Sequence, residues 1–188
     1  MSRAGEGDKD NALVIRGAEA DDMPAVAAIF ARYVLDTVIT FELQPPSVED
    51  WRAKQRELEA AGWPFLVAVV EEELIGYAYV TPWRSKPAYR QTVENTIYLA
   101  PEHTGQGHGR VLLAELLAHA RTADARQVIA VIADTGNPAS VALHRRAGFA
   151  DVGRLRNVGF KHGQWLDTVL MQSSLDDLGV EVRAEVGG

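Results

Sequence analysis

Apolar residues recur along the chain with two spacings, which together predict the order of its elements. Positions three or four residues apart predict four helices: 23–34, 47–61, the run "VLLAELLAHA" that follows residue 110, and the segment that "NPAS" opens. Continuous or alternating apolar runs predict strands at 13–18, 65–70, 74–83, 92–100 and 128–133, and on both sides of "KHGQ". The predicted order is β-α-α-β-β-β-α-β-α-β-β, a mixed sheet of the α/β (α+β) class with helices packed on it.

Short polar motifs mark where these elements begin and turn. Ser47, with Asp50 three residues later, resembles a capping box and opens a helix. Asn137 can cap the helix that follows it, and Pro138 suits the first helical position. The strands at 92–100 and 128–133 are joined by a helix, so they should lie parallel in the sheet.

Composition narrows the class of protein without naming a function. The chain has 188 residues, of which 47% are hydrophobic and 24% charged, and this fits one globular domain over 13–175. The polar residues 1–12 predict a disordered extension, and residues 176–188 a frayed acidic tail. The chain has no cysteine, which excludes disulfides and thiolate chemistry.

The net charge and the hydropathy of the sequence argue against two classes of partner, nucleic acids and membranes. The net charge of −7 argues against a nucleic-acid surface, although it allows one local basic pocket for an anion. The sequence has neither a signal peptide nor an apolar run of about 18 residues, so we expect a cytoplasmic protein without a membrane span.

The stretch "HTGQGHGR" (103–110) lies between a predicted strand and a predicted helix, and it is the first candidate for chemistry. Backbone N–H groups of such a loop, with the positive end of a helix dipole, can bind a phosphate. The loop lacks the Lys-Ser or Lys-Thr of a Walker A motif, and its G-x-G-x-G spacing is not the dinucleotide fingerprint. A glycine-rich turn without a ligand remains an alternative, as does a solvated role for Arg110.

The strand before this loop carries a carboxylate. Alternation places Thr92, Glu94, Thr96 and Tyr98 on one face, and Val93, Asn95, Ile97 and Leu99 on the other. A carboxylate in a central strand costs free energy unless its face lines a wet cleft. Desolvation there would raise the pKa of Glu94 and suit it to act as a general base, whereas an exposed or ion-paired glutamate is the alternative.

These motifs together resemble a known family. "IYLAPEHTGQGHGRVLL" resembles motif A of the GCN5-related N-acetyltransferases (GNAT), and "NPASVALHRRAGF" resembles the segment that follows it. "TFELQPPSVEDW", "TPWRSKPAYRQTVENTIYL" and "VGFKHGQWLDTVLMQ" are similar to the phosphinothricin N-acetyltransferase branch, which includes methionine sulfoximine and methionine sulfone acetyltransferases. The resemblance covers roughly residues 13–175. It implies a GNAT fold, with a mostly antiparallel mixed sheet, helices on both faces and a splayed parallel strand pair.

The resemblance implies acetyl-CoA as co-substrate, no metal, and a set of cofactor contacts. Backbone groups of Ile97, Tyr98 and Leu99 would pair with pantetheine, and Asn137 would contact the cofactor. The loop would hold the pyrophosphate through Thr104, Gly105, Gln106, Gly107, His108, Gly109 and Arg110. Thr104 departs from the Gln or Arg usual at its position, and His108 stands where an apolar residue is common.

The resemblance also implies the acceptor side of the reaction. Glu94 corresponds to the general base of the branch, and the acceptor would be the α-amine of a small amino acid such as phosphinothricin, methionine sulfoximine or methionine sulfone. The substrate-binding residues would be Phe41, Arg84, Ser85, Lys86, Glu94, Asn95 and Thr96. His144 is expected as a satisfied core histidine. The "KHGQ" hairpin, marked by His162 and Trp165, is expected to help build the substrate pocket and the contact in a homodimer.

Three alternatives remain at the level of the sequence. The same chemistry could serve another amine, such as a polyamine, an aminoglycoside or a protein N-terminus. A second alternative is a non-catalytic acyl-CoA-binding module, which only the change at Thr104 supports. A nucleotide-binding domain is the third, and the missing Lys-Ser/Thr counts against it.

Overall fold

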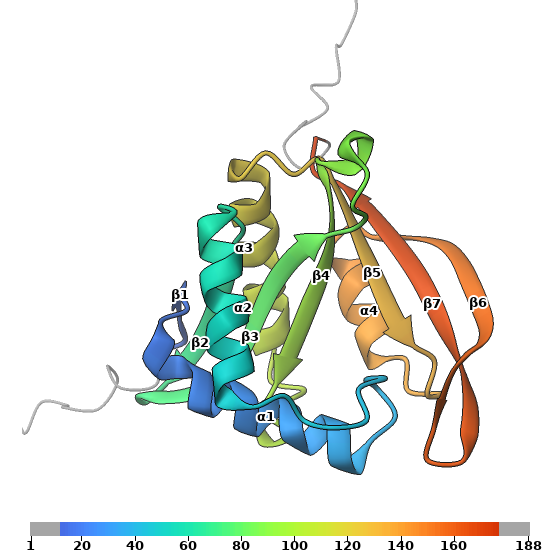
Figure 1. Ribbon diagram of the computed structural model, residues 1–188, viewed down its shortest axis with the longest axis horizontal. Helices are drawn as coiled ribbons and strands as arrows, with labels where there is room; N and C mark the ends of the chain where they lie inside the picture. The colour runs from blue at the N-terminus through green and yellow to red at the C-terminus, as the bar shows by residue number, and fades with distance from the viewer. Residues whose placement is uncertain (1–11, 177–188) are drawn as a thin grey trace, which may run out of the picture.

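The computed structural model describes residues 12–176, which form one seven-stranded sheet with helices on both faces (Figure 1). The strand order is β1-β2-β3-β4-β5-β7-β6. The strands are β1 (Val14–Gly17), β2 (Phe65–Val70), β3 (Glu73–Pro82), β4 (Thr92–Leu99), β5 (Gln127–Ala133), β6 (Ala150–Lys161) and β7 (Gln164–Ser174). The helices are α1 (Met23–Asp36), α2 (Val48–Ala60), α3 (His108–Thr122) and α4 (Ala139–Arg146), and three 3-10 turns lie at η1 (Ala20–Asp22), η2 (Pro87–Tyr89) and η3 (Pro101–His103). This confirms the element order that the hydrophobic pattern predicts.

The helices divide between two apolar cores, one on each face of the sheet. On one face α1 and α2 pack Met23, Phe30 and Trp51 against the strands. On the other face α3 places Leu112 and Leu116 in a second cluster with β-strand residues, and α4 contributes to its edge. The alternation predicted for β4 is confirmed, because Val93 belongs to the α3 cluster while Tyr98 packs with the α1–α2 cluster.

The capping box predicted at the start of α2 is confirmed, whereas the start of α4 differs from the prediction by one residue. The Ser47 hydroxyl accepts from the N–H of Asp50, and the Asp50 carboxylate accepts from the N–H of Ser47, so the capping box is complete. Helix α4 begins at Ala139, one residue later than predicted, because Pro138 is its N-cap. Asn137 instead accepts the N–H of Ala139 through Oδ1 at 2.9 Å. The predictions for residues 1–11 and 177–188 lie outside the described residues.

Strands β4 and β5 are the one parallel pair among the described strands, and they separate along their length. They pair only at Thr92–Gln127, Val93–Val128 and Glu94–Ile129. Beyond Glu94 the two strands diverge, which Figure 1 shows as an open V in the middle of the sheet. The remainder of β4 stays in register with β3, from Asn95 opposite Val80 to Leu99 opposite Gly76. The splayed pair is therefore confirmed, and it leaves one edge of β4 without a strand partner.

Candidate active site

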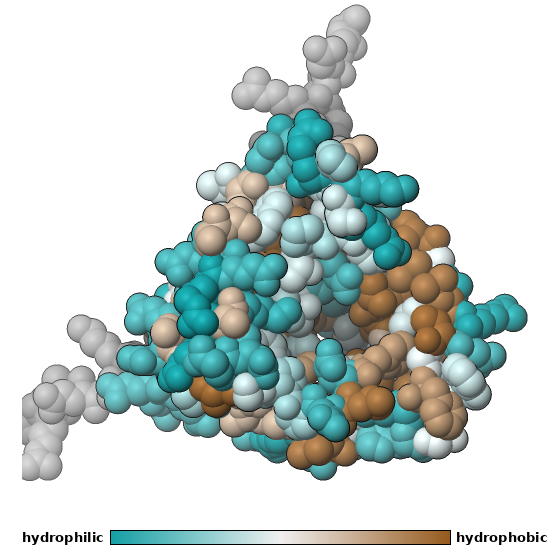
Figure 2. Space-filling model, viewed as in Figure 1, coloured by the Kyte–Doolittle hydropathy of each residue, from teal (hydrophilic) through white to brown (hydrophobic). Residues whose placement is uncertain are grey.

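Glu94 lies on β4 at the point where the two parallel strands part. Its side chain is half-buried on the face that carries α1 and α2, and Figure 2 shows this face hollowed over the diverging strands. Burial raises the pKa of Glu94 above its usual range, and the positive charge of Arg84 partly offsets this effect. A carboxylate with a raised pKa in a hollow has the properties of a general base that works near neutral pH.

Aromatic and hydroxyl side chains surround this carboxylate on the same face. Tyr79 of β3 is buried, which raises the pKa of its phenol; Thr96 of β4 acts in the opposite direction, and the charge of Glu94 raises this pKa further. Burial raises the pKa of Tyr98 to about 12, while Thr40, from the loop between α1 and α2, acts in the opposite direction. The hollow is therefore bounded by β4, β3 and the α1–α2 loop.

The glycine loop between η3 and α3 presents unpaired donors. Gly105 and Gly107 have φ of 76° and 90°, a region that side-chain-bearing residues rarely adopt, and a Cβ at either position would point into open space. Within residues 12–176, no carbonyl or side chain accepts from the consecutive backbone N–H groups of residues 105–109. Five free donors at the N-terminus of a 15-residue helix form a cradle for an anion.

Gly109, the third glycine of the loop, is explained by helix packing rather than by anion binding. A Cβ at Gly109 would stand 3.4 Å from Cδ1 of Leu99 and 3.6 Å from Cδ2 of Leu143. Helix α3 therefore approaches β4 and α4 closely at this residue. The three glycines at alternate positions thus have two different physical reasons.

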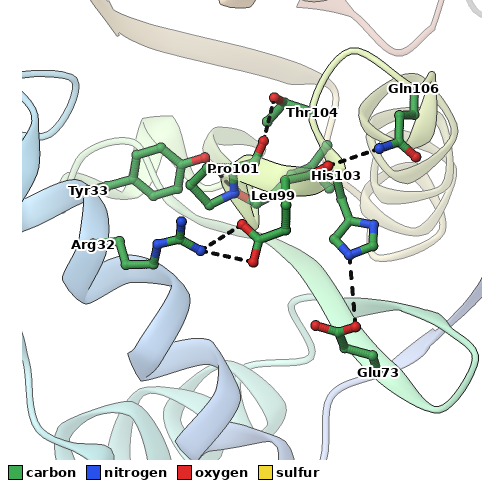
Figure 3. Close-up of polar contacts among 9 residues, drawn as sticks. Arg32, Tyr33, Glu73, Leu99, Pro101, His103, Thr104 and Gln106 are labelled. Atoms are coloured by element: carbon green, nitrogen blue, oxygen red, sulfur yellow. Dashed lines mark hydrogen bonds and ion pairs between the residues drawn. The ribbon is translucent and has the colours of Figure 1, made fainter.

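The loop is braced by contacts with its own turn and with neighbouring elements (Figure 3). The Thr104 hydroxyl donates to the carbonyl of Pro101 at 2.7 Å, and the Gln106 amide donates to the carbonyl of Glu102 at 2.9 Å. Arg32 of α1 donates to both carboxylate oxygens of Glu102, at 3.0 and 2.6 Å. Thr104 and Gln106 therefore use their side chains to hold the loop. The backbone N–H of Thr104 also donates to the carbonyl of Pro101, so the donors left for a ligand begin at Gly105.

Strand geometry decides which backbone groups of β4 face the gap. Ala100 donates its N–H to Ile75, and Trp83 donates its N–H to Thr92. Because hydrogen-bonded pairs alternate in an antiparallel ladder, Tyr98 also points its backbone groups toward β3, while Ile97 and Leu99 point theirs toward the gap. The structure thus brings two of the three predicted backbone contacts to the gap. The carbonyl of Leu99 already accepts from the Tyr33 hydroxyl at 2.5 Å.

Asn95 lies on the face of β4 opposite Glu94. Its Nδ2 lies 3.0 Å from Nε2 of His144, whose Nδ1 lies 2.8 Å from the carbonyl of Ser140. His144 is buried, so its pKa is lowered, and a neutral ring that donates from Nδ1 and accepts at Nε2 satisfies both contacts. His144 is the satisfied buried histidine that the sequence predicts. The structure does not bring the Asn95 side chain together with Glu94 and Thr96.

The other predicted site residues are distributed around the hollow and the loop. Arg84 is exposed after β3, with its guanidinium 4.6 Å from the ring centre of Trp83, and Ser85 and Lys86 are exposed beside it. Phe41 packs on β6, where a Cβ at Gly159 would stand 2.4 Å from its Cε2. The remaining cofactor candidates, His108, Arg110 and Asn137, lie at the N-terminal ends of α3 and α4.

Sequence reasoning missed two parts of this site. No local pattern groups Thr40, Tyr79 and Lys161, which lie in the α1–α2 loop, in β3 and in β6. Sequence reasoning also gave no sign of the bracing of the loop by Arg32, because that contact spans 70 residues. No group of three or more His, Asp or Glu side chains that could share a metal ion occurs in residues 12–176, and no helix there is long and apolar enough to cross a membrane.

Comparison with known proteins agrees with this geometry. The model of the acetyltransferase (GNAT) family matches residues 28–149. The chain is 45% identical to phosphinothricin N-acetyltransferase of Alcaligenes faecalis over 165 residues, covering 88% of this chain and 84% of that protein. It is 34% identical to L-methionine sulfoximine/L-methionine sulfone acetyltransferase of Salmonella typhimurium, covering 88% and 96%.

A solved structure of a similar protein has the same fold. The crystal structure of a phosphinothricin acetyltransferase from Sinorhizobium meliloti in complex with acetyl-CoA superposes with a TM-score of 0.82 at 41% identity, covering 86% of this chain and 88% of that one. A splayed sheet with a glycine loop at the start of a helix defines the GNAT class of acyltransferases. This chain belongs to the acetyltransferase (GNAT) family, and it has the GNAT fold.

Proposed function

We propose that this enzyme transfers the acetyl group of acetyl-CoA to the α-amine of a small amino acid, with Glu94 as the general base. One observation carries the proposal. A half-buried carboxylate with a raised pKa stands where β4 leaves β5, on the strand that leads into a loop of five unpaired N–H donors. The names of the relatives, which act on phosphinothricin and methionine sulfoximine, support the choice of acceptor.

The residues present fit the cofactor. The free N–H groups of residues 105–109 suit its pyrophosphate, and Arg110 next to them adds positive charge. The outward backbone groups of Ile97 suit the amides of pantetheine, since that edge of β4 has no strand partner. Asn137, already bonded to Ala139, would present its remaining donors at the start of α4. When bound, acetyl-CoA supplies an activated acyl thioester.

The acceptor amine must lose a proton before it can attack a thioester, and Glu94 accepts that proton directly or through a water. Burial disfavours the charged carboxylate, so the raised pKa of Glu94 brings its basicity closer to that of the amine. A backbone N–H on the open edge of β4, at Ile97, stabilises the negative charge that develops on the carbonyl oxygen. Arg84, whose charge reaches Glu94, binds the acceptor's α-carboxylate, with Ser85 and Lys86 beside it and Thr96 and Phe41 on the opposite walls.

The test is a thiol-release assay with acetyl-CoA and a panel of acceptors. We expect turnover with phosphinothricin, methionine sulfoximine or methionine sulfone, and little with spermidine, kanamycin or an N-terminal peptide. Turnover on the polycations alone would overturn the amino-acid assignment. Binding of acetyl-CoA with no acceptor turned over would favour the non-catalytic module.

We further propose that the protein works as a homodimer in the cytoplasm, where acetyl-CoA is consumed by such enzymes. The support is the edge strand β6, whose residues 150–158 are all exposed, including Val152, Leu155 and Val158. Figure 2 shows an apolar patch on this side of the hollowed face, over the strands that no helix covers. A long exposed apolar edge is a surface that proteins normally cover.

Sedimentation equilibrium tests this assembly. We expect a dimer for the native chain and a monomer for Leu155→Glu. Leu35, on α1, is more exposed than Leu155, and Leu35→Glu should leave the dimer intact. A monomeric native chain at micromolar concentration would contradict the proposal.

A further inference from the structure

Lys161, the last residue of β6, is a buried cation without a counter-ion. Its side chain is 3% exposed, which is unusual for a lysine. Its single hydrogen bond to another described residue runs from Nζ to the carbonyl of Thr40, at 2.9 Å. Within residues 12–176 no carboxylate lies within 4 Å of its nitrogen. Buried charges are normally paired, so this ammonium requires an explanation.

The carbonyl of Thr40 does not neutralise the charge. A carbonyl is a dipole that satisfies one of the three N–H donors of the ammonium. Burial lowers the pKa of Lys161, and the nearby charge of Glu42 acts in the opposite direction. Glu42 is itself exposed, so water screens much of its effect. Residues 12–176 therefore supply no carboxylate that pairs directly with this cation.

The contacts of Lys161 lead toward the face of β4 that carries Glu94. Thr40, to which it donates, also acts on the pKa of Tyr98, and Tyr98 shares the face of β4 with Glu94. Next to Thr40, Phe41 packs on Gly159 of the same strand as Lys161. Figure 1 shows the α1–α2 loop reaching toward the β6–β7 hairpin below the open ends of β4 and β5.

The charges of Arg84 and Lys161 act on different carboxylates. The charge of Arg84 acts on the pKa of Glu94, whereas that of Lys161 is coupled to Glu42 instead. The α-carboxylate of an amino acid is one carbon from the amine that Glu94 deprotonates, so it belongs near Arg84. The end of the acceptor's side chain extends away from the amine, toward Lys161.

We propose that Lys161 is a specificity-determining residue that binds the anionic head of the acceptor's side chain, such as a phosphinate. This inference rests on the proposed function, because it takes an amino acid as the acceptor. The ammonium gains the counter-ion it lacks, and the anion exchanges water for a charge-assisted hydrogen bond. An acceptor whose head is polar and uncharged, such as a sulfone, gains less from the same contact.

The test compares two acceptors in one variant. Lys161→Met keeps the length and apolar stem of the side chain and removes its charge. For phosphinothricin, which has an anionic phosphinate, we expect KM to rise roughly ten- to hundredfold with kcat within about twofold. For methionine sulfone, whose head is neutral, we expect KM to change less than about threefold. Lys161→Arg should restore most of the affinity for phosphinothricin.

The outcomes separate this inference from its alternatives. Equal losses on both acceptors would show that Lys161 only fastens the α1–α2 loop to β6, and would overturn the proposal. Unchanged KM for phosphinothricin would also overturn it, while turnover of either acceptor by the native enzyme would leave the proposed function standing. A native enzyme that neither acetylates nor binds phosphinothricin by calorimetry would contradict both. A thermal melt of each variant confirms that it is folded.

Discussion

Replacement of Glu94 by glutamine should separate the catalytic and the structural consequences of its burial. Glutamine keeps the shape of the side chain and cannot accept the proton of the amine. A positioned general base contributes about 10²- to 10⁴-fold to a rate, or about 3 to 5 kcal/mol of barrier. We therefore expect Glu94→Gln to lower kcat with a bound amino acid by that factor in a thiol-release assay at pH 7.5. The affinity for acetyl-CoA, measured by calorimetry, should change little.

The dependence on pH follows from the direction of the pKa shift. Because burial raises the pKa of Glu94, the rising limb of the native rate profile should lie above the 4.5 of an ordinary glutamate. The gap between the native enzyme and Glu94→Gln should close as the pH falls through that limb. Arg84→Gln removes the charge that lowers the same pKa, so its rising limb should move to higher pH.

At pH 7.5, Glu94→Gln should raise the stability of the folded protein while it lowers the activity. A group with a folded pKa raised above its unfolded value favours the folded state fully below the unfolded pKa, and that advantage is lost as the pH rises through the folded pKa. At pH 7.5 the charged Glu94 is therefore a cost, and Glu94→Gln should raise the melting temperature there but not near pH 4. Glu57→Gln, an exposed glutamate on α2, is the matched control and should alter neither quantity. Native activity in Glu94→Gln would refute the role of Glu94 as base.

Two pairs of glycine variants test the anion-binding loop and the acceptor side of the site. Gly107→Val should cost roughly 1–2 kcal/mol of folding stability from its left-handed backbone and abolish binding of acetyl-CoA by calorimetry, whereas Gly62→Val, with φ of 74° in a distant turn, should show the stability loss alone. Equal cofactor binding by the two variants would contradict the anion cradle. Gly159→Ala should push Phe41 aside and raise the KM of the amino acid but not of acetyl-CoA, while Gly153→Ala on the same strand, with nothing within 4 Å, should change neither. Native acceptor KM in Gly159→Ala would exclude Phe41 from the pocket.

Local patterns in the sequence predict the parts of this fold that depend on short-range physics. The alternation along β4 places Glu94 and Asn95 on opposite faces, and the structure confirms this. The capping box at Ser47 is confirmed for the same reason, since its partners are three residues apart. Helix α4 differs by one residue, because Asn137 can cap the backbone with or without Pro138 inside the helix.

The parts that could not be predicted depend on contacts between distant segments. Lys161 sits beside a hairpin turn, and a lysine there is normally solvated, so its burial beneath Thr40, 121 residues away, leaves no local sign. The sequence also does not distinguish the glycines of the loop. Only the structure shows that Gly107 has an open left-handed backbone while Gly109 is held against Leu99.

Mass spectrometry of the reaction product tests the central claim most directly. The enzyme is incubated with deuterium-labelled acetyl-CoA and methionine sulfone or phosphinothricin, and the product is fragmented to locate the label. We expect one labelled acetyl group on the α-nitrogen, formed in equal amount to free CoA, and its near absence with Glu94→Gln. Free CoA without a labelled amino acid, or a label on any other atom, would contradict it.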